Sequence, residues 1–78
     1  MLLTHNGIRE RLEKITQNIR RIREGKNYSQ EYMATRLNIS QNTYSKLELG
    51  YTALTVDRLI QIAAILETNM IDLLAPDK

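Results

Sequence analysis

Hydrophobic residues recur along the first third of the chain with the spacing of a helix. The apolar positions, separated by four, three, four and three residues, are Ile8, Leu12, Ile15, Ile19 and Ile22. This alternation is typical of one long helix with a narrow apolar seam. It predicts a helix from about residue 8 to about residue 24. Residues 25–27, Gly-Lys-Asn, have the composition that commonly ends a helix.

A shorter helix is predicted to begin after Ser29, whose side chain can cap it. Its apolar face consists of Tyr32, Met33 and Leu37, which are helically spaced. Asn38 follows, and asparagine tolerates the left-handed backbone that closes a helix and starts a tight turn. The pattern therefore predicts that the chain reverses sharply at this point.

A second short helix is predicted to start at Ser40, again a good capping residue. Tyr44 and Leu47 turn inward in this helix, and Gly50 follows it. The remaining side chains form an outward polar row of Gln41, Asn42, Thr43, Ser45 and Lys46. Amides, hydroxyls and a lysine are side chains that can bond to base edges in a DNA major groove.

A fourth helix is predicted from Thr55, as its cap, to about Glu67. The inward arc is predicted to contain Val56, Leu59, Ile62, Ala63 and Leu66. Ile60, Ala64 and Ile65 extend the apolar surface around the helix, so we expect it to be buried on a second side as well. A last short helix is predicted over residues 70–74. Five helices and no strand candidate indicate an all-α fold.

Composition narrows the classes of function. A chain of 78 residues allows one small domain with a marginal core, so oligomerisation is expected. There is no cysteine, which excludes disulfides and thiolate chemistry. No nucleophile–base pair, paired carboxylates, phosphate-binding glycine loop or metal-ligand cluster is present, so no enzyme activity, cofactor or metal is expected. No stretch resembles a signal peptide or membrane span, so we expect a cytoplasmic protein without a membrane partner.

Charge is distributed unevenly although the net charge is only +2. Residues 1–28 carry seven Lys/Arg against three Glu, whereas residues 29–50 carry two against two and residues 51–78 two against four. A cationic N-terminal third suits a surface that faces phosphates. A solvated helix face of like charge explains the same numbers equally well, so the charge alone does not decide between these two interpretations.

The chain resembles the lambda-repressor-like, Cro/XRE-type helix-turn-helix family. The matching positions are Ile19, Ile22, Arg23, the segment SQEYMA at 29–34, Leu37, Ile39, Ser40, Tyr44, Ser45, Leu47, Glu48, Gly50, Leu59, Ile62, Ala63, Leu66, Leu73 and Leu74. The resemblance implies a five-helix lambda-repressor-like DNA-binding domain over residues 19–75, with its helix-turn-helix unit at 29–49. Residues 1–18 are then an N-terminal extension of the first helix. In that family the third helix enters the major groove, and most members are dimeric transcription regulators.

The resemblance also assigns roles to single residues. The expected base-reading side chains are Gln41, Asn42, Ser45 and Lys46. The resemblance gives Gln30 a phosphate contact. The further expected phosphate contacts are Ser29, Ser40, Thr43, Arg20, Lys26 and Tyr51. Arg23 and Glu48 are expected to form a structural pair that ties the first helix to the end of the recognition helix.

Surplus apolar residues outside the expected core point to a dimer surface. These candidates are Ile8, Leu12, Ile15, Ile60, Ala64, Ile65, Met70 and Ile71. In so small a domain, such residues are best buried against a second subunit.

The sequence departs from the family pattern at two places. Asn38 replaces the usual glycine of the turn, and the loop after Gly50 carries Tyr51 and Thr52 in place of a lysine or arginine. With few cationic phosphate contacts, we expect a shallow salt dependence of DNA binding for each subunit.

The leading hypothesis is a sequence-specific DNA-binding transcriptional regulator, a repressor that binds a pseudo-palindromic operator as a homodimer. The alternative is an antitoxin-like or other protein-interaction module with the same fold, which would use its surplus apolar surface for a protein partner. An enzyme is the least supported class, because no catalytic constellation is present.

Overall fold

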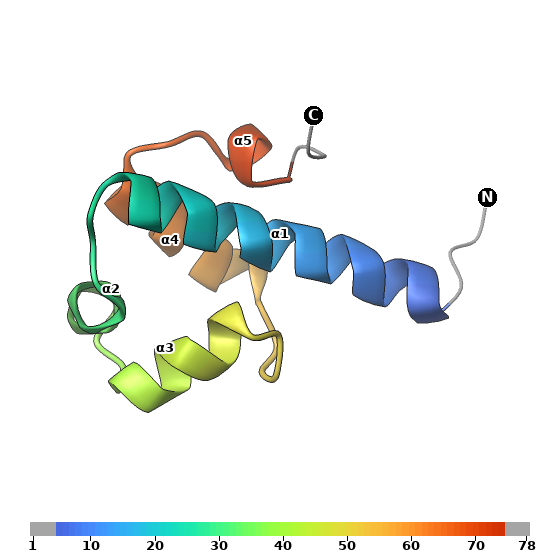
Figure 1. Ribbon diagram of the computed structural model, residues 1–78, viewed down its shortest axis with the longest axis horizontal. Helices are drawn as coiled ribbons and strands as arrows, with labels where there is room; N and C mark the ends of the chain where they lie inside the picture. Colours follow the sequence, from blue (N-terminus) through green and yellow to red (C-terminus); the bar gives the residue numbers. More distant parts are fainter. Residues whose placement is uncertain (1–4, 75–78) are drawn as a thin grey trace.

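Five helices and their connections make up the computed structural model, which describes residues 5–74. The helices are α1 His5–Gly25, α2 Gln30–Leu37, α3 Gln41–Glu48, α4 Val56–Leu66 and α5 Met70–Leu74 (Figure 1). No strand occurs within residues 5–74, so the predicted all-α, five-helix fold is confirmed. Residues 1–4 of the predicted extension and Ala75, at the end of the predicted domain, lie outside the described residues.

Three helices begin at hydroxyl side chains that cap them. Ser29 Oγ accepts a hydrogen bond of 2.9 Å from the backbone N–H of Tyr32 at the start of α2. Ser40 Oγ and Thr55 Oγ1 accept equivalent bonds of 3.1 Å at the starts of α3 and α4. Each bond satisfies a backbone donor that has no partner within its own helix. The three predicted caps are therefore confirmed.

The first four helices end at residues with a left-handed backbone: Asn27 (φ 60°), Asn38 (φ 59°), Gly50 (φ 80°) and Glu67 (φ 54°). In each case the next backbone N–H bonds to a carbonyl five residues earlier, as in the 3.0 Å bond from Ile39 to Ala34. This motif satisfies carbonyls left open at the helix end. Asparagine in two of these positions explains why the turn at Asn38 closes without a glycine.

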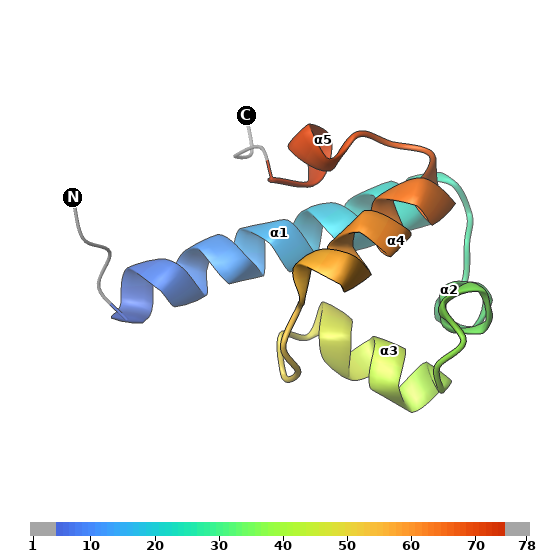
Figure 2. The ribbon, with the colours of Figure 1, turned by 180° about the vertical axis from the view of Figure 1, so that it is seen from behind.

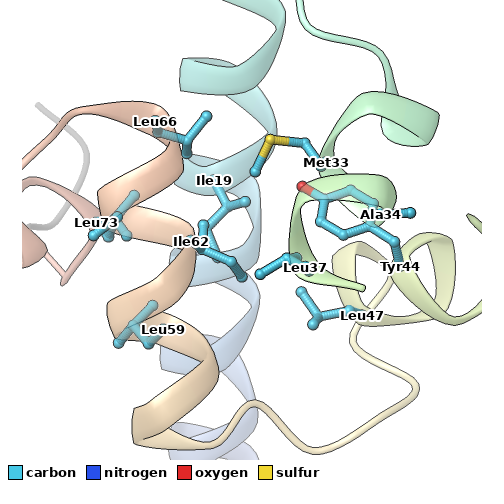
Figure 3. Packing of buried hydrophobic residues seen from close by; sticks show 11 residues of the cluster. Ile19, Met33, Ala34, Leu37, Tyr44, Leu47, Leu59, Ile62, Leu66 and Leu73 are labelled. Carbon is cyan, nitrogen blue, oxygen red and sulfur yellow. The ribbon is translucent and has the colours of Figure 1, made fainter. Parts of the chain in front are cut away.

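The core lies where α1, α2, α3 and α4 meet, and α5 covers its edge (Figures 2 and 3). Its buried hydrophobic residues are Ile19, Met33, Ala34, Leu37, Tyr44, Leu47, Leu59, Ile62, Ala63, Leu66 and Leu73. One predicted core member was wrong, because Val56 is 68% exposed. It is the first residue of α4 and lies at the edge of the arc made by Leu59, Ile62 and Leu66, so its side chain misses the core.

The N-terminal half of α1 projects beyond the rest of the bundle (Figures 1 and 2). Its apolar seam continues into this projection, where Ile8 is 47% and Leu12 46% exposed, whereas Ile19 is fully buried in the core. The extended first helix is therefore confirmed. None of the helices within residues 5–74 has the length and apolar character needed to cross a membrane.

Two glycines allow a matched test of the helix ends. Gly25 lies within α1, whereas Gly50 has a φ of +80°, and an added Cβ would meet no atom within 4 Å at either position. Gly25→Ala should therefore raise the free energy of unfolding by about 0.5–1 kcal/mol. Gly50→Ala should lower it by about 1–2 kcal/mol, because alanine is strained in the left-handed region. Urea denaturation measures both changes, and equal signs would contradict this account.

Candidate nucleic-acid interface

Helix α3 lies at one side of the bundle (Figure 1), and its polar side chains are mostly exposed. The side chains of Gln41, Asn42 and Lys46 are exposed, and Ser45 is half-buried. On the opposite side of the helix, Tyr44 is fully buried and Leu47 is 3% exposed. The burial of this apolar side fixes the rotation of α3 about its axis. All four predicted base-reading residues therefore lie on one short helix, and the structure leaves three of them open to solvent.

The start of α3 carries two hydroxyls that bond to one another. Ser40 Oγ donates to Thr43 Oγ1 at 2.8 Å and accepts from the Thr43 backbone N–H at 3.1 Å. The Thr43 hydroxyl accepts in this pair, so its own proton remains available for an outside acceptor. Both residues are exposed. A phosphate oxygen placed here would also meet the positive end of the α3 dipole.

The start of α2 holds two more predicted phosphate contacts, Ser29 and Gln30. The Ser29 hydroxyl is exposed and serves as the helix cap. Gln30 is half-buried, and its Nε2 donates to Glu48 Oε1 at 3.2 Å. This bond uses one of the two amide protons, so the second proton remains for another acceptor. Gln30 is thus positioned by α3 while it stands at the first turn of α2.

An ion pair joins α1 to the last residue of α3. Arg23 Nε donates to Glu48 Oε2 at 2.7 Å, and Arg23 Nη2 donates to Glu48 Oε1 at 3.2 Å. The third nitrogen, Arg23 Nη1, donates to the backbone carbonyl of Tyr28 at 2.8 Å. Arg23 is 7% exposed and Glu48 is 8% exposed. The structure therefore brings the expected structural pair together in a bidentate geometry, which is the strong form of this interaction.

Tyr44 completes the set of donors around this carboxylate. Its hydroxyl donates to Glu48 Oε2 at 2.5 Å. Burial first, and then the hydrogen bond to Glu48, raise the pKa of Tyr44 above its ordinary value of 10.0. Burial alone would lower the pKa of Arg23, but the hydrogen bond and charge of Glu48 outweigh it, so that pKa is raised. Both shifts favour the neutral tyrosine and the charged arginine in the folded chain.

The side chains of the remaining predicted phosphate contacts, Arg20, Lys26 and Tyr51, are exposed, and no buried contact holds them in place. Arg20 Nε lies 3.3 Å from Glu24 Oε2 in a pair whose side chains are 61% and 55% exposed. Lys26 is exposed at the end of α1. Tyr51 is 73% exposed after α3. These side chains can move to meet a phosphate backbone, because no buried contact holds them.

Two positioning residues escaped the sequence analysis. Asn18, 3% exposed, donates from Nδ2 to the carbonyl of Leu73 at 2.9 Å and ties α5 to α1. Arg58 Nη1 donates to the carbonyl of Leu37 at 3.4 Å and so supports the end of α2. The only local signal for Asn18 is a small polar residue beside the apolar seam. No local pattern in the sequence indicated the role of Arg58, because its partner Leu37 is 21 residues away in the chain.

Some residues of the predicted dimer surface are exposed, and others pack against the core of their own chain. Ile8, Leu12, Ile60, Ala64 and Ile71 are exposed. Ile15, Ile65 and Met70 are partly buried and pack against the core of their own chain. Ile71 is the most open of the large side chains in this set, at 76% exposed. The free apolar surface therefore lies on the projecting half of α1 and on the outer sides of α4 and α5.

Metal-binding chemistry has no support in the described part of the chain. Residues 5–74 contain no group of three or more His, Asp or Glu side chains arranged to hold a metal ion. The polar side chains that converge in this structure are instead Arg23, Gln30 and Tyr44, which all donate to the carboxylate of Glu48.

Comparison with known proteins agrees with this geometry. The family model HTH_3, described as helix-turn-helix, matches residues 19–73, well over half of the chain. The match runs from the buried part of α1 to α5. No curated protein and no solved structure matches the chain.

The buried pair should contribute strongly to folding. Arg23→Ala leaves the Glu48 carboxylate buried without its cation, so we expect the free energy of unfolding to fall by about 3–5 kcal/mol. Arg20→Ala is the matched control, since it removes an arginine of the same helix whose partner is exposed, and should cost less than about 1 kcal/mol. Chemical denaturation gives both values. Similar losses for the two variants would show that the pair acts only as a surface contact.

The raised pKa of Tyr44 predicts a loss of stability in alkali. The folded chain holds the tyrosine proton more tightly than the unfolded chain, where the pKa is about 10. This contribution is fully present below about pH 10 and is lost as the pH rises further, at about 1.4 kcal/mol per pH unit. Tyr44→Phe should remove this slope from the free energy of unfolding measured against pH. Tyr51→Phe, which changes an exposed tyrosine, should keep it. Identical slopes for Tyr44→Phe and the unaltered chain would refute the assignment.

Proposed function

The chain belongs to the Cro/C1-type helix-turn-helix family, and from this premise we propose that it is a sequence-specific transcriptional repressor that binds its operator as a homodimer. The family assignment supports DNA binding through the helix-turn-helix unit. The observation that carries the finer proposal is the polar face of α3, held outward by the buried Tyr44 and Leu47.

Base reading in this proposal depends on the first turns of α3. Gln41 and Asn42 are exposed at the N-terminal end of the helix, the end that enters the groove. An amide side chain can bond bidentately to adenine N6 and N7, and each such pair is worth about 1–3 kcal/mol of discrimination. Ser45 and Lys46 follow further along the helix, where they reach bases or flanking phosphates. The operator should therefore contain adenine in each half-site.

Phosphate binding in this proposal relies on helix starts more than on cations. Ser29 and Gln30 present the first turn of α2, and Ser40 and Thr43 present that of α3. Arg20, Lys26 and the Tyr51 hydroxyl add exposed contacts. A neutral donor releases few counterions when it meets a phosphate, so we expect a shallow dependence of affinity on salt.

A homodimer would place two α3 helices in successive major grooves, about 34 Å apart on a pseudo-palindromic site. Occupancy of a promoter by such a dimer represses transcription by excluding the polymerase, which requires no further domain. Cytoplasmic localisation follows from this role.

An antitoxin-like or other protein-interaction role is the second candidate. It is favoured by the exposed apolar side chains of Ile8, Leu12, Ile60 and Ile71, which a protein partner could cover. An antitoxin would still bind DNA through α3, so the two candidates differ in what covers this surface.

Selection from random duplex DNA tests the proposal directly. In moderate salt, the full chain should enrich an inverted repeat whose half-sites lie about one helical turn apart. Sequencing of the selected pool gives the operator. Weak, salt-sensitive binding without enrichment would contradict a sequence-specific regulator and favour the protein-interaction role.

Substitution of the proposed base-reading residues should reduce sequence discrimination without reducing the stability of the fold. The double variant Gln41→Ala with Asn42→Ala should lower discrimination between operator and random DNA by about thirtyfold or more, because each of the two lost bidentate contacts is worth about 1–3 kcal/mol. Its melting temperature should stay close to that of the unaltered chain, since both residues are exposed. Gln17→Ala, an exposed glutamine of α1, is the control. Retained discrimination in the double variant would refute these two reading residues.

A further inference from the structure

The projecting half of α1 carries an apolar seam that stays exposed among residues 5–74, the part of the chain that the structure describes. Ile8 is 47% and Leu12 46% exposed, and Ile15 is only partly buried. We call residues 5–15 the arm, because they extend past the other helices (Figures 1 and 2). The seam continues in register with Ile19 of the core, so the arm offers a preformed helical ridge.

The charges on the arm have a definite arrangement around this seam. Successive residues of a helix are rotated by about 100°. Arg9 and Arg11 therefore flank the seam on its two sides, within about 100° of its centre. Glu10 and Glu13 lie on the opposite side of the helix, about 130° or more from the seam. Of the Lys, Arg and Glu residues of the arm, only Arg9 and Arg11 therefore border the apolar ridge.

This arrangement disfavours pairing of two arms with each other. In a coiled coil, the residues that flank the seam of one helix lie against those that flank the seam of its partner. Two identical arms would bring Arg9 and Arg11 against their own copies, and like charges at such positions are repulsive. The arm therefore calls for a surface that is apolar along its middle and acidic at its borders.

Helix α4 has an exposed apolar row on its outer side, with one acidic residue beside it and another at its end. Val56, Ile60 and Ala64 follow one another at intervals of four residues, and all three are exposed. Asp57 lies beside this row, and Glu67 stands at its C-terminal end. The only cation of α4, Arg58, lies about 160° from the row and bonds to the carbonyl of Leu37. The row spans about 12 Å. The seam from Ile8 to Ile15 spans about 10.5 Å, and its last residue, Ile15, also packs on the core of its own chain.

We propose that the arm of one copy packs on the outer face of α4 of a second copy, and that the second copy returns the same contact. The apolar seam would cover the row of Val56, Ile60 and Ala64, and Arg9 and Arg11 would meet the acidic borders. The proposal rests on the homodimer of the proposed function and names its interface.

A reciprocal exchange of arms has consequences for DNA binding. It buries two equivalent contacts in each dimer, as a twofold interface requires. It uses residues of α1 and α4 and leaves the polar face of α3 free in both copies. Because the arm is continuous with the buried part of α1, it would also hold the two recognition helices at one spacing.

Cysteine cross-linking tests which surfaces meet, because the chain contains no cysteine of its own. Chains carrying Leu12→Cys are mixed with chains carrying Ile60→Cys and oxidised under mild conditions. Non-reducing electrophoresis with tagged chains of different size should show mainly the mixed dimer. Gln17→Cys, on the side of α1 away from the seam, is the matched control and should not cross-link to Ile60→Cys.

Each other cross-linking result overturns the proposal. Dimers of Leu12→Cys alone would mean that the arms pair with each other. Dimers of Ile60→Cys alone would mean that the two α4 helices meet. A chain that sediments as a monomer at concentrations where it binds DNA would show that no second copy occupies the surface, and a separate protein partner would then be its occupant.

Charge reversal supplies the independent measurement. Arg9→Glu with Arg11→Glu should raise the dimer dissociation constant in sedimentation by about tenfold. Adding Asp57→Lys and Glu67→Lys should restore most of the affinity, since the charges then match again. If the double variant instead stays as dimeric as the unaltered chain but binds DNA more weakly with a smaller salt slope, the arm contacts DNA and the proposal fails. Operator enrichment by a chain that never cross-links would leave the proposed function intact and reject only this interface.

Discussion

The buried carboxylate of Glu48 is the interaction on which the arrangement of the helices depends. It lies at the C-terminal end of α3, where the helix dipole disfavours a negative charge. Removal from water adds a further cost, so the carboxylate requires donors on both oxygens. Arg23 supplies two, Tyr44 one and Gln30 one. These residues come from α1, α3 and α2, and one carboxylate therefore fixes three helices relative to one another.

This constraint fixes the orientation of α3 and therefore of its polar face. Leu47 and Tyr44 bury the opposite side of the helix, and the Glu48 network fixes its C-terminal end. Gln30 bonds to the same carboxylate and stands at the first turn of α2. The start of α2 and the end of α3 are thus held by one group, so a phosphate contact at the start of α2 would be rigidly related to base contacts made by α3. Preorganised groups lose less entropy on binding.

Structural features that depend on residues close together in the chain could be predicted from the sequence. Periodicity located the first four helices, and Ser29, Ser40 and Thr55 marked three of their starts, because caps act within three residues. Contacts between segments that are distant in the chain could not be predicted from local patterns. Val56 was assigned to the core from helical periodicity alone, but periodicity does not show which turns of a helix are packed against other helices. The bond from Asn18 to Leu73 spans 55 residues and leaves no local pattern. Arg23 and Glu48 were paired only through the family resemblance.

The structure also refines the meaning of the cationic N-terminal third. Its seven basic residues do not form one phosphate-facing surface. Arg23 is committed to Glu48, Arg21 donates to Asn18 at 3.2 Å, and Arg20 lies against Glu24. Arg9 and Arg11 stand on the arm, beyond the bundle that holds α3. The phosphate-facing interpretation belongs to the proposed function, in which Arg20 and Lys26 are exposed cations at the domain body, whereas the buried Arg23 supports the fold. In the proposed mode of DNA binding, affinity for phosphate would then come largely from helix starts, and a second copy on the same operator would add to it.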